Sequence, residues 1–135
     1  MNTTTPSTKT RMITLTGRRP VKIVEADWPV IAQGSGSEHD GQVECQANRA
    51  WKVWMKVRQH ADGRAIVYGC AEYESHFQAE RDYAERAGML LDAGEDIAAA
   101  IGDVGHALRE VAEDQSDRIG AVERMCVADL PAEIL

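Results

Sequence analysis

The chain has few of the features that mark membrane spans, disulfide frameworks or metal sites. Its 135 residues contain no apolar run of about 18 residues, so no membrane-spanning helix is predicted. The three cysteines, Cys45, Cys70 and Cys126, are odd in number and far apart, and residues 1–11 lack the apolar segment of a signal peptide. We therefore expect reduced thiols and a cytoplasmic protein.

Signatures of catalysis and of cofactors are also lacking. The four histidines form none of the spacings typical of zinc ligands, so no metal or cofactor is predicted. The glycines within residues 33–41 do not have the spacing of a phosphate-binding loop, and no helix is expected to follow them. A nucleophilic pair of Cys70 with His60 or His76 is one enzymatic alternative, and a core position for Cys70 disfavours it. A carboxylate pair for acid–base catalysis is another, but acidic residues on helices usually form a solvated face. We interpret the chain as a binding protein.

Lysine is absent after Lys56, and this absence reflects a strong division of charge. Residues 1–70 carry ten basic and six acidic side chains, whereas residues 71–135 carry five basic and sixteen acidic ones. The net charge of the whole chain is −7. An asymmetry of this kind is informative about binding partners and says little about the fold.

Alternating apolar residues predict a run of strands in the first half. Strands are expected at residues 12–16, 20–25, 42–46, 51–59 and 65–73, with a short helix starting after Asp27 and a flexible loop at residues 33–41. Asp62-Gly63 between two alternating runs predicts a two-residue hairpin loop. This loop would place Val57 opposite Tyr68 and Met55 opposite Cys70. One face would then be apolar and form the core: Trp51, Val53, Met55, Val57, Ile66, Tyr68 and Cys70.

Helices are expected in the second half. Ser75 followed by Gln78 resembles a capping box, which predicts a helix over residues 76–91. The spacing of Ile97, Ile101, Val104, Leu108 and Val111 predicts a second helix, and Ser116 or Asp117 can cap a third that ends before Pro131. The sequence therefore predicts an α+β fold: an antiparallel β-meander of about four to five strands followed by about three helices packed on it. We expect residues 1–11 to form a disordered tail and residues 12–135 a single domain.

Two candidate binding surfaces follow from the charge pattern. The first is the second face of the strand at residues 51–59, where basic and aromatic side chains alternate as in platforms for single-stranded nucleic acid. Its residues are Lys52, Trp54, Lys56 and Arg58. The alternative is that helices cover this face, and the overall negative charge opposes binding to a polyanion.

The second candidate surface is acidic and lies in the half predicted to be helical. A dense carboxylate surface can imitate nucleic-acid phosphates and attract a basic channel on another protein. Its alternative is a solubilising surface without a partner. The residues are Glu80, Asp82, Glu85, Glu95, Asp96, Asp103, Glu110, Glu113, Asp114 and Asp117.

Three segments, EHDGQVE (residues 38–44), VRQHADGRAIVYG (57–69) and DLPAE (129–133), resemble small proteins encoded in prophages and other mobile elements of proteobacteria. The resemblance spans most of the chain from Met12 onward. It implies a genetic neighbourhood in which small acidic proteins are often inhibitors of host defence, including anti-CRISPR proteins, and it supplies no functional residues.

These observations predict a non-enzymatic phage or mobile-element protein that inhibits a host nucleic-acid-handling defence complex, such as a CRISPR-Cas effector, through its acidic helical surface. The alternative is a nucleic-acid-binding accessory protein that uses the basic and aromatic sheet face. Neither the partner nor the oligomeric state follows from the sequence.

Overall fold

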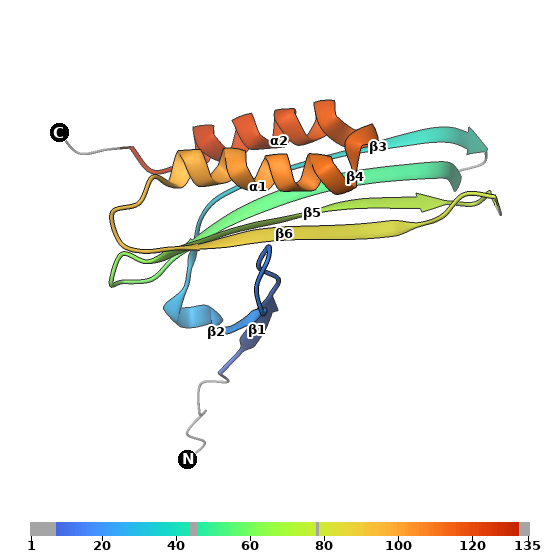
Figure 1. The fold of residues 1–135 in the computed structure, drawn as a ribbon. Helices are drawn as coiled ribbons and strands as arrows, with labels where there is room; N and C mark the ends of the chain where they lie inside the picture. The colour runs from blue at the N-terminus through green and yellow to red at the C-terminus, as the bar shows by residue number, and fades with distance from the viewer. Residues whose placement is uncertain (1–7, 44–45, 78, 133–135) are drawn as a thin grey trace, which may run out of the picture.

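Four long strands form an antiparallel sheet in the order β3-β4-β5-β6 in the computed structural model, which describes residues 8–43, 46–77 and 79–132 (Figure 1). A separate two-stranded hairpin, β1-β2, precedes the sheet, and two helices follow it. The α+β fold predicted from the sequence is therefore confirmed. The strands are β1 (Thr10–Ile13), β2 (Val21–Val24), β3 (Val30–Val43), β4 (Gln46–Gln59), β5 (Ala65–Ser75) and β6 (Tyr83–Leu91); the helices are α1 (Ile97–Val111) and α2 (Ser116–Asp129), with 3-10 turns η1 (Glu25–Asp27) and η2 (Glu113–Gln115).

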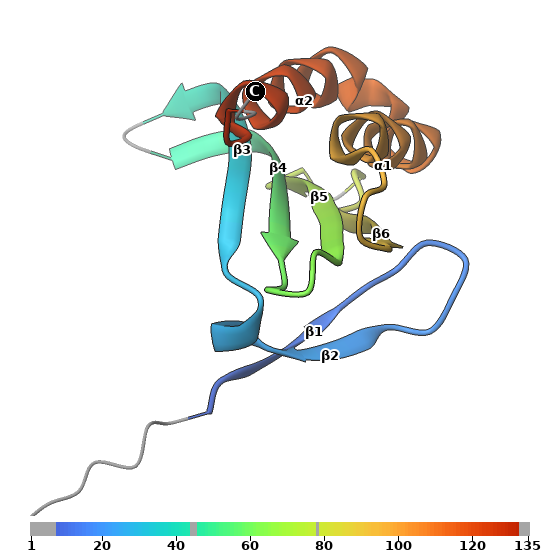
Figure 2. The ribbon, with the colours of Figure 1, turned by 90° about the vertical axis from the view of Figure 1, so that its left-hand side faces the viewer.

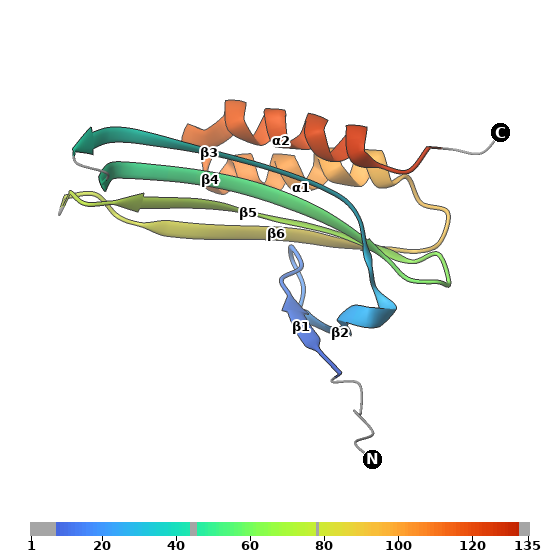
Figure 3. The same ribbon diagram turned by 180° about the vertical axis from the view of Figure 1, so that it is seen from behind.

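The two faces of the sheet have different cover. Both helices lie on one face, α1 over β5 and β6 and α2 over β3 and β4, while the β1-β2 hairpin lies on the other (Figure 1 and Figure 2). We call these the helix face and the open face. The strands also run past the turn between the helices, so the helix face is uncovered at that end (Figure 3).

The main core lies between the sheet and the helices. Val53, Met55 and Val57 of β4 and Val67 of β5 contribute from the sheet, and each is completely buried. The helical side is the stripe predicted from spacing, with Ile101, Val104 and Leu108 of α1 buried; Val111 of the same stripe is exposed. A smaller cluster joins the hairpin to the open face and contains Ile13, Leu15, Ile23, Trp28, Ile66 and Tyr68.

The glycine- and serine-rich stretch predicted as a loop is in fact most of the edge strand β3. Gly34 and Gly36 face α2, and a Cβ at Gly34 would lie 2.8 Å from the carbonyl oxygen of Val122 and 2.9 Å from the Cβ of Met125. The small residues therefore let α2 approach the edge of the sheet closely. The predicted short helix after Asp27 is also wrong, because η1 ends at Asp27 and β3 begins at Val30.

The helix predicted over residues 76–91 is also wrong, because residues 83–91 form strand β6. Ser75 does not cap a helix; its hydroxyl accepts a hydrogen bond from the backbone N–H of Phe77 at 3.0 Å within a turn. Ala87 and Leu91 are buried as expected, but their spacing also fits a strand that places Ala87 and Leu91 on one face. Within the described residues, two helices rather than three therefore follow the sheet.

The hairpin between β4 and β5 has a loop one residue longer than predicted. The backbone N–H of His60 donates a hydrogen bond to the backbone carbonyl of Arg64 at 2.9 Å. Residues 61–63 form the loop, with Gly63 at a φ of 97°. Three-residue loops with glycine at the left-handed position are a common hairpin type. The pairing is Val57 with Val67 and Met55 with Gly69. Since a slip of one residue exchanges the faces of a strand, Ile66, Tyr68 and Cys70 lie on the open face rather than the helix face.

Residues 1–7 of the predicted disordered tail lie outside the described residues. Thr10 and Arg11, also in that tail, belong to strand β1. Arg11 forms an ion pair with Glu25, with 2.6 Å between Nε and Oε1.

Candidate functional site

The basic and aromatic side chains of β4 lie on the open face of the sheet. Val53, Met55 and Val57 point into the helix-side core, so the alternate residues Lys52, Trp54 and Lys56 project from the opposite side. The helices therefore do not cover them, contrary to the alternative weighed from the sequence. Lys52 is exposed, and Trp54 and Lys56 are half-buried.

Arg58, the fourth predicted member of this surface, is buried and has a structural role. Its side chain donates to the hydroxyl of Tyr68 at 2.8 Å and to the backbone carbonyl of Trp28 at 3.0 Å. Its Nη2 also lies 4.0 Å from a carboxylate oxygen of Glu25. Arg58 thus ties the segment before β3 to the sheet and is not available to a ligand.

Two arginines that sequence reasoning missed join the open face. Arg86 of β6 is paired with Cys70, which is itself paired with Trp54, and its guanidinium carbon lies 6.0 Å from the centre of the Trp54 ring. The Nζ of Lys56 lies 5.5 Å from the same ring. Arg11 of the hairpin lines a hollow together with Trp54 and Arg86. Arg86 was missed because residues 76–91 were predicted to form a helix. The alternation of side chains along a strand would have placed Arg86 on the open face.

Positive charges crowd this surface. Burial lowers the pKa of Lys56, and repulsion from Arg11, Arg58 and Lys52 lowers it further. Among the described residues, Lys52, Lys56 and Arg86 take part in no ion pair. Glu72 is opposite Lys52 in the register. The carboxylate of Glu72 is on the same face, 3.6 Å from Cys70 Sγ, so the cations around Trp54 have one acid beside them.

Two hollows flank Trp54 on the open face. The larger, of about 440 Å³, lies at the β3 edge; it is lined by Gln33, Ser35, Lys52 and Lys56, and also by Met55 and by Met125 of α2. The smaller, of about 160 Å³, lies between the hairpin and the sheet. Its walls are residues 11–14 with Trp54, Tyr68, Gly69, Arg86 and Ala87.

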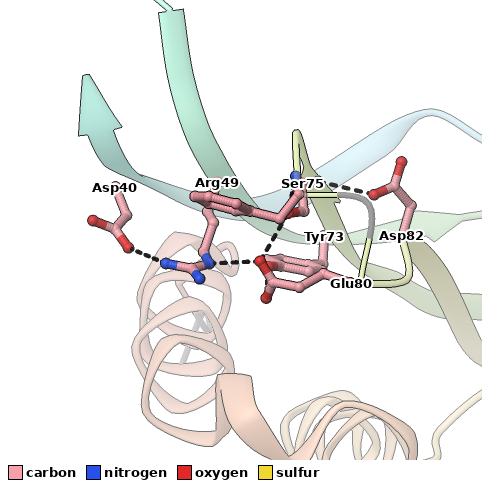
Figure 4. Close-up of polar contacts among 7 residues, drawn as sticks. Asp40, Arg49, Tyr73, Ser75, Glu80 and Asp82 are labelled. Carbon is pink, nitrogen blue, oxygen red and sulfur yellow. Dashed lines mark hydrogen bonds and ion pairs between the residues drawn. The ribbon is translucent and has the colours of Figure 1, made fainter. Parts of the chain in front are cut away.

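Two of the predicted acidic residues are used to fix the connection between β5 and β6. The carboxylate of Glu80 accepts hydrogen bonds from Arg49 Nε, Tyr73 Oη and Ser75 Oγ at 2.7 to 2.8 Å (Figure 4). Asp82 accepts the backbone N–H of Ser75 at 2.8 Å. The hydrogen bonds from Tyr73 and Ser75, followed by Arg49, hold the pKa of Glu80 below its ordinary value.

Three more acidic residues have local structural partners. Asp96 is the N-cap of α1 and accepts the backbone N–H of Ala99, while Glu95 accepts that of Asp92. Asp114 accepts the hydroxyl of Tyr83 at 2.9 and 3.0 Å. Burial raises the pKa of Tyr83 to about 12. These carboxylates stabilise turns and helix ends.

The remaining five do not form one surface with the others. Asp103 and Glu110 are exposed on the side of α1 away from the buried stripe, and Glu113 and Asp117 are exposed at the turn between the helices. The Oε1 atom of Glu110 lies 3.1 Å from Nε2 of His106, one helical turn away. Glu85 is half-buried on β6. The ten predicted residues are thus divided among the start of α1, the outer side of α1 with the α1–α2 turn, and β6 with the connection before it.

The described thiols are poor nucleophiles. Cys70 and Cys126 are buried, and burial raises the pKa of each to about 11. His60 lies in the β4–β5 hairpin, where its ring packs on Trp28 at 5.0 Å between centroids. The pair next to the hairpin loop is Gln59 with Ala65, and Cys70 is five residues farther along β5, roughly 17 Å away along the strand. Cys70 and His60 therefore do not form a nucleophilic pair. Cys45 lies outside the described residues.

Within residues 8–43, 46–77 and 79–132, no group of three or more His, Cys, Asp and Glu side chains is placed to hold a metal ion. Neither helix of this part of the chain has both the length and the apolar character that a membrane span requires. No protein family, curated protein or solved structure matches the chain.

Proposed function

We propose that this protein is a nucleic-acid-binding protein, without enzymatic activity, that uses the open face of its sheet. The observation that carries the proposal is the group of Lys52, Lys56 and Arg86 around Trp54, free of ion pairs among the described residues, on the face opposite the helices. Lysine and arginine supply the phosphate contacts that dominate affinity for nucleic acids. An aromatic ring between them is typical of proteins that bind unpaired bases.

The net charge of −7 does not cancel this surface. The exposed acids Asp103 and Glu110 lie on the outer side of α1, and a helix about 10–12 Å in diameter separates them from the sheet. Exposed charges farther apart than the Debye length, about 8 Å at physiological salt, are largely screened from each other. A phosphate at the open face therefore interacts mainly with the local cations.

Fluorescence anisotropy with a labelled oligonucleotide tests the proposal. We expect binding that weakens as salt rises from about 50 to 200 mM. The Lys52→Gln, Lys56→Gln double variant should bind about tenfold more weakly, and its slope of log affinity against log salt should fall by about 1.4 if both lysines contact a single strand. Arg124→Gln removes an exposed cation from α2 and serves as the control.

Binding that the double variant leaves unchanged, or no binding of the folded wild type at about 50 mM salt, would rule out the open face as a nucleic-acid surface. Circular dichroism of each variant establishes that the fold is retained. Lys52 is exposed and Lys56 half-buried, so loss of their charges should leave the core intact.

A second candidate function uses the acidic helical surface. We propose it for a partner with a basic channel, such as a host nucleic-acid-handling defence complex, in line with the resemblance to mobile-element proteins. It is supported by Asp103, Glu113 and Asp117, which are exposed and form no ion pair in the described part of the chain. Opposite charge on a partner would steer association.

Charge reversal separates this candidate from the first. Asp103→Lys, Glu113→Lys and Asp117→Lys together should abolish salt-sensitive recovery of a protein partner from the host while oligonucleotide binding remains. Unchanged recovery of the same partner would refute the electrostatic form of this candidate.

A further inference from the structure

The open face is shaped in a way that selects among nucleic acids, and this inference rests on the proposed function. We infer that the ligand is a single strand, and that it crosses the strands of the sheet from the hollow at the β3 edge, past Trp54, into the cleft between the hairpin and the sheet. This path adds Arg11, which is ion-paired with Glu25, to the site and makes the hairpin its far wall.

The path follows from the two hollows, which have Trp54 as a common wall. Lys52 and Lys56 line the hollow at the β3 edge, and Arg11 and Arg86 line the cleft at the hairpin. Lys52 and Lys56 flank Trp54 along β4, and Arg86 lies across β5 on β6, so cations surround the indole ring both along β4 and toward the hairpin. A groove of cations with an aromatic ring in its course is the arrangement by which proteins hold single strands without a strong sequence preference.

The hairpin is held firmly enough to act as a wall. Ile13 and Leu15 are buried against the open face, at 1% and 3% exposure. The backbone N–H of Thr16 donates to the carbonyl of Gly88 at 2.8 Å, and the N–H of Gly88 donates to the hydroxyl of Thr16 at 3.1 Å. These bonds attach the hairpin to the edge strand β6, so the cleft beside Arg86 has two fixed sides.

The size of this cleft favours an unpaired strand over a duplex. Its volume of about 160 Å³ lies between residues 11–14 and the sheet, which leaves room for one base or phosphate group at a time. A duplex presents two backbones across grooves about 6 and 12 Å wide and keeps its bases stacked inside. A duplex therefore cannot place a base in the cleft, whereas an unpaired strand can bend into it.

The indole ring is positioned for contact with an unpaired base. Trp54 is half-buried, and the edge-on ring of Tyr68, with an interplanar angle of 87° and a centroid distance of 5.6 Å, supports it from the sheet. Lys56 and Arg86 lie 5.5 and 6.0 Å from its centre. A base beside this ring places its own phosphate within reach of one of these cations.

Competition anisotropy with the full chain tests the inference. A labelled single-stranded oligothymidine is displaced by unlabelled single strand, by a duplex of the same length and by inorganic polyphosphate, with wild type, Arg86→Gln and the control Arg124→Gln. We expect the duplex and polyphosphate to compete at least tenfold more weakly than the single strand. Arg86→Gln should weaken binding several-fold and lower the salt slope by about 0.7, the change for one phosphate contact on a single strand.

The outcomes separate this inference from the proposed function. Equal competition by the duplex, with weakening by the Lys52→Gln, Lys56→Gln variant, would leave the nucleic-acid function standing and overturn the single-strand path. Normal affinity of Arg86→Gln would overturn the path through the cleft. Equal competition by polyphosphate, or no binding of any oligonucleotide, would overturn both.

Discussion

Single residues decide how closely the layers of this protein pack. Gly34 of β3 lies against the backbone of α2, where a Cβ would come within 2.8 Å of the Val122 carbonyl oxygen and 3.1 Å of the Cys126 nitrogen. Gly36, two residues along the same strand, has only ordinary contacts, with Val122 Cγ2 at 3.6 Å. The two glycines therefore have different structural roles despite their similar sequence surroundings.

The Gly34→Ala substitution should destabilise the protein by about 1–3 kcal/mol, the usual effect of overpacking against groups that cannot move aside. Gly36→Ala should be neutral or slightly stabilising, because alanine has less conformational freedom to lose on folding. Urea denaturation of both variants measures the difference. Equal stability of the two variants would contradict the close packing of α2 on β3.

Burial also controls the chemistry of the thiols. Because the pKa of Cys70 is raised to about 11, little thiolate exists at pH 8. Iodoacetamide should therefore alkylate Cys70 in the native protein at least tenfold more slowly than in urea, as followed by peptide mass spectrometry. Rapid native alkylation would reopen a nucleophilic role for this residue.

At the scale of elements, the sequence predicted what side-chain pattern determines and missed what packing determines. The alternation of residues 51–59 placed Lys52, Trp54 and Lys56 on one face correctly. Strand β3 was missed because Gly34 and Gly36 carry no pattern, and only contact with α2 explains them. Strand β6 was missed because its apolar spacing also suits a helix, and Arg86 was lost from the candidate site with it.

The connection between β5 and β6 should be sensitive to acid. The pKa of Glu80 is lower in the folded protein than its ordinary value, so its contribution to stability is complete above that value and is lost as pH falls through the folded pKa. Wild type should be more stable than Glu80→Gln at pH 7, and the difference should shrink below about pH 4. Urea midpoints across this pH range measure it, and a difference independent of pH would contradict the role of the charged carboxylate.

At the scale of the whole molecule, the division of charge along the chain becomes a partial division in space, since Glu72 of the acidic half lies opposite Lys52 on the open face. Lys52 and Lys56 of the first half, joined by Arg86, occupy the open face, while Asp103 and Glu110 lie on the outer side of the helices. The composition of the sequence indicated the asymmetry of charge. That Arg58 is buried and that Glu80 holds a local turn could be seen only in the three-dimensional structure.

This separation has a measurable dependence on salt. Neutralising the outer acids with Asp103→Asn and Glu110→Gln should change oligonucleotide affinity less than about twofold at 0.15 M salt, where the Debye length is about 8 Å. Affinity should rise clearly at 0.01 M, where the Debye length is about 30 Å. An equal rise at both salt concentrations would contradict the separation of the two faces.

Ultraviolet cross-linking of a thymidine-containing single strand, followed by proteolysis and mass spectrometry, tests most directly the claim that the open sheet face is the binding surface. Our account predicts adducts in β4 around Trp54, greatly reduced in the Lys52→Gln, Lys56→Gln variant and unchanged in Arg124→Gln. Adducts that map only to α1 and α2 would contradict it.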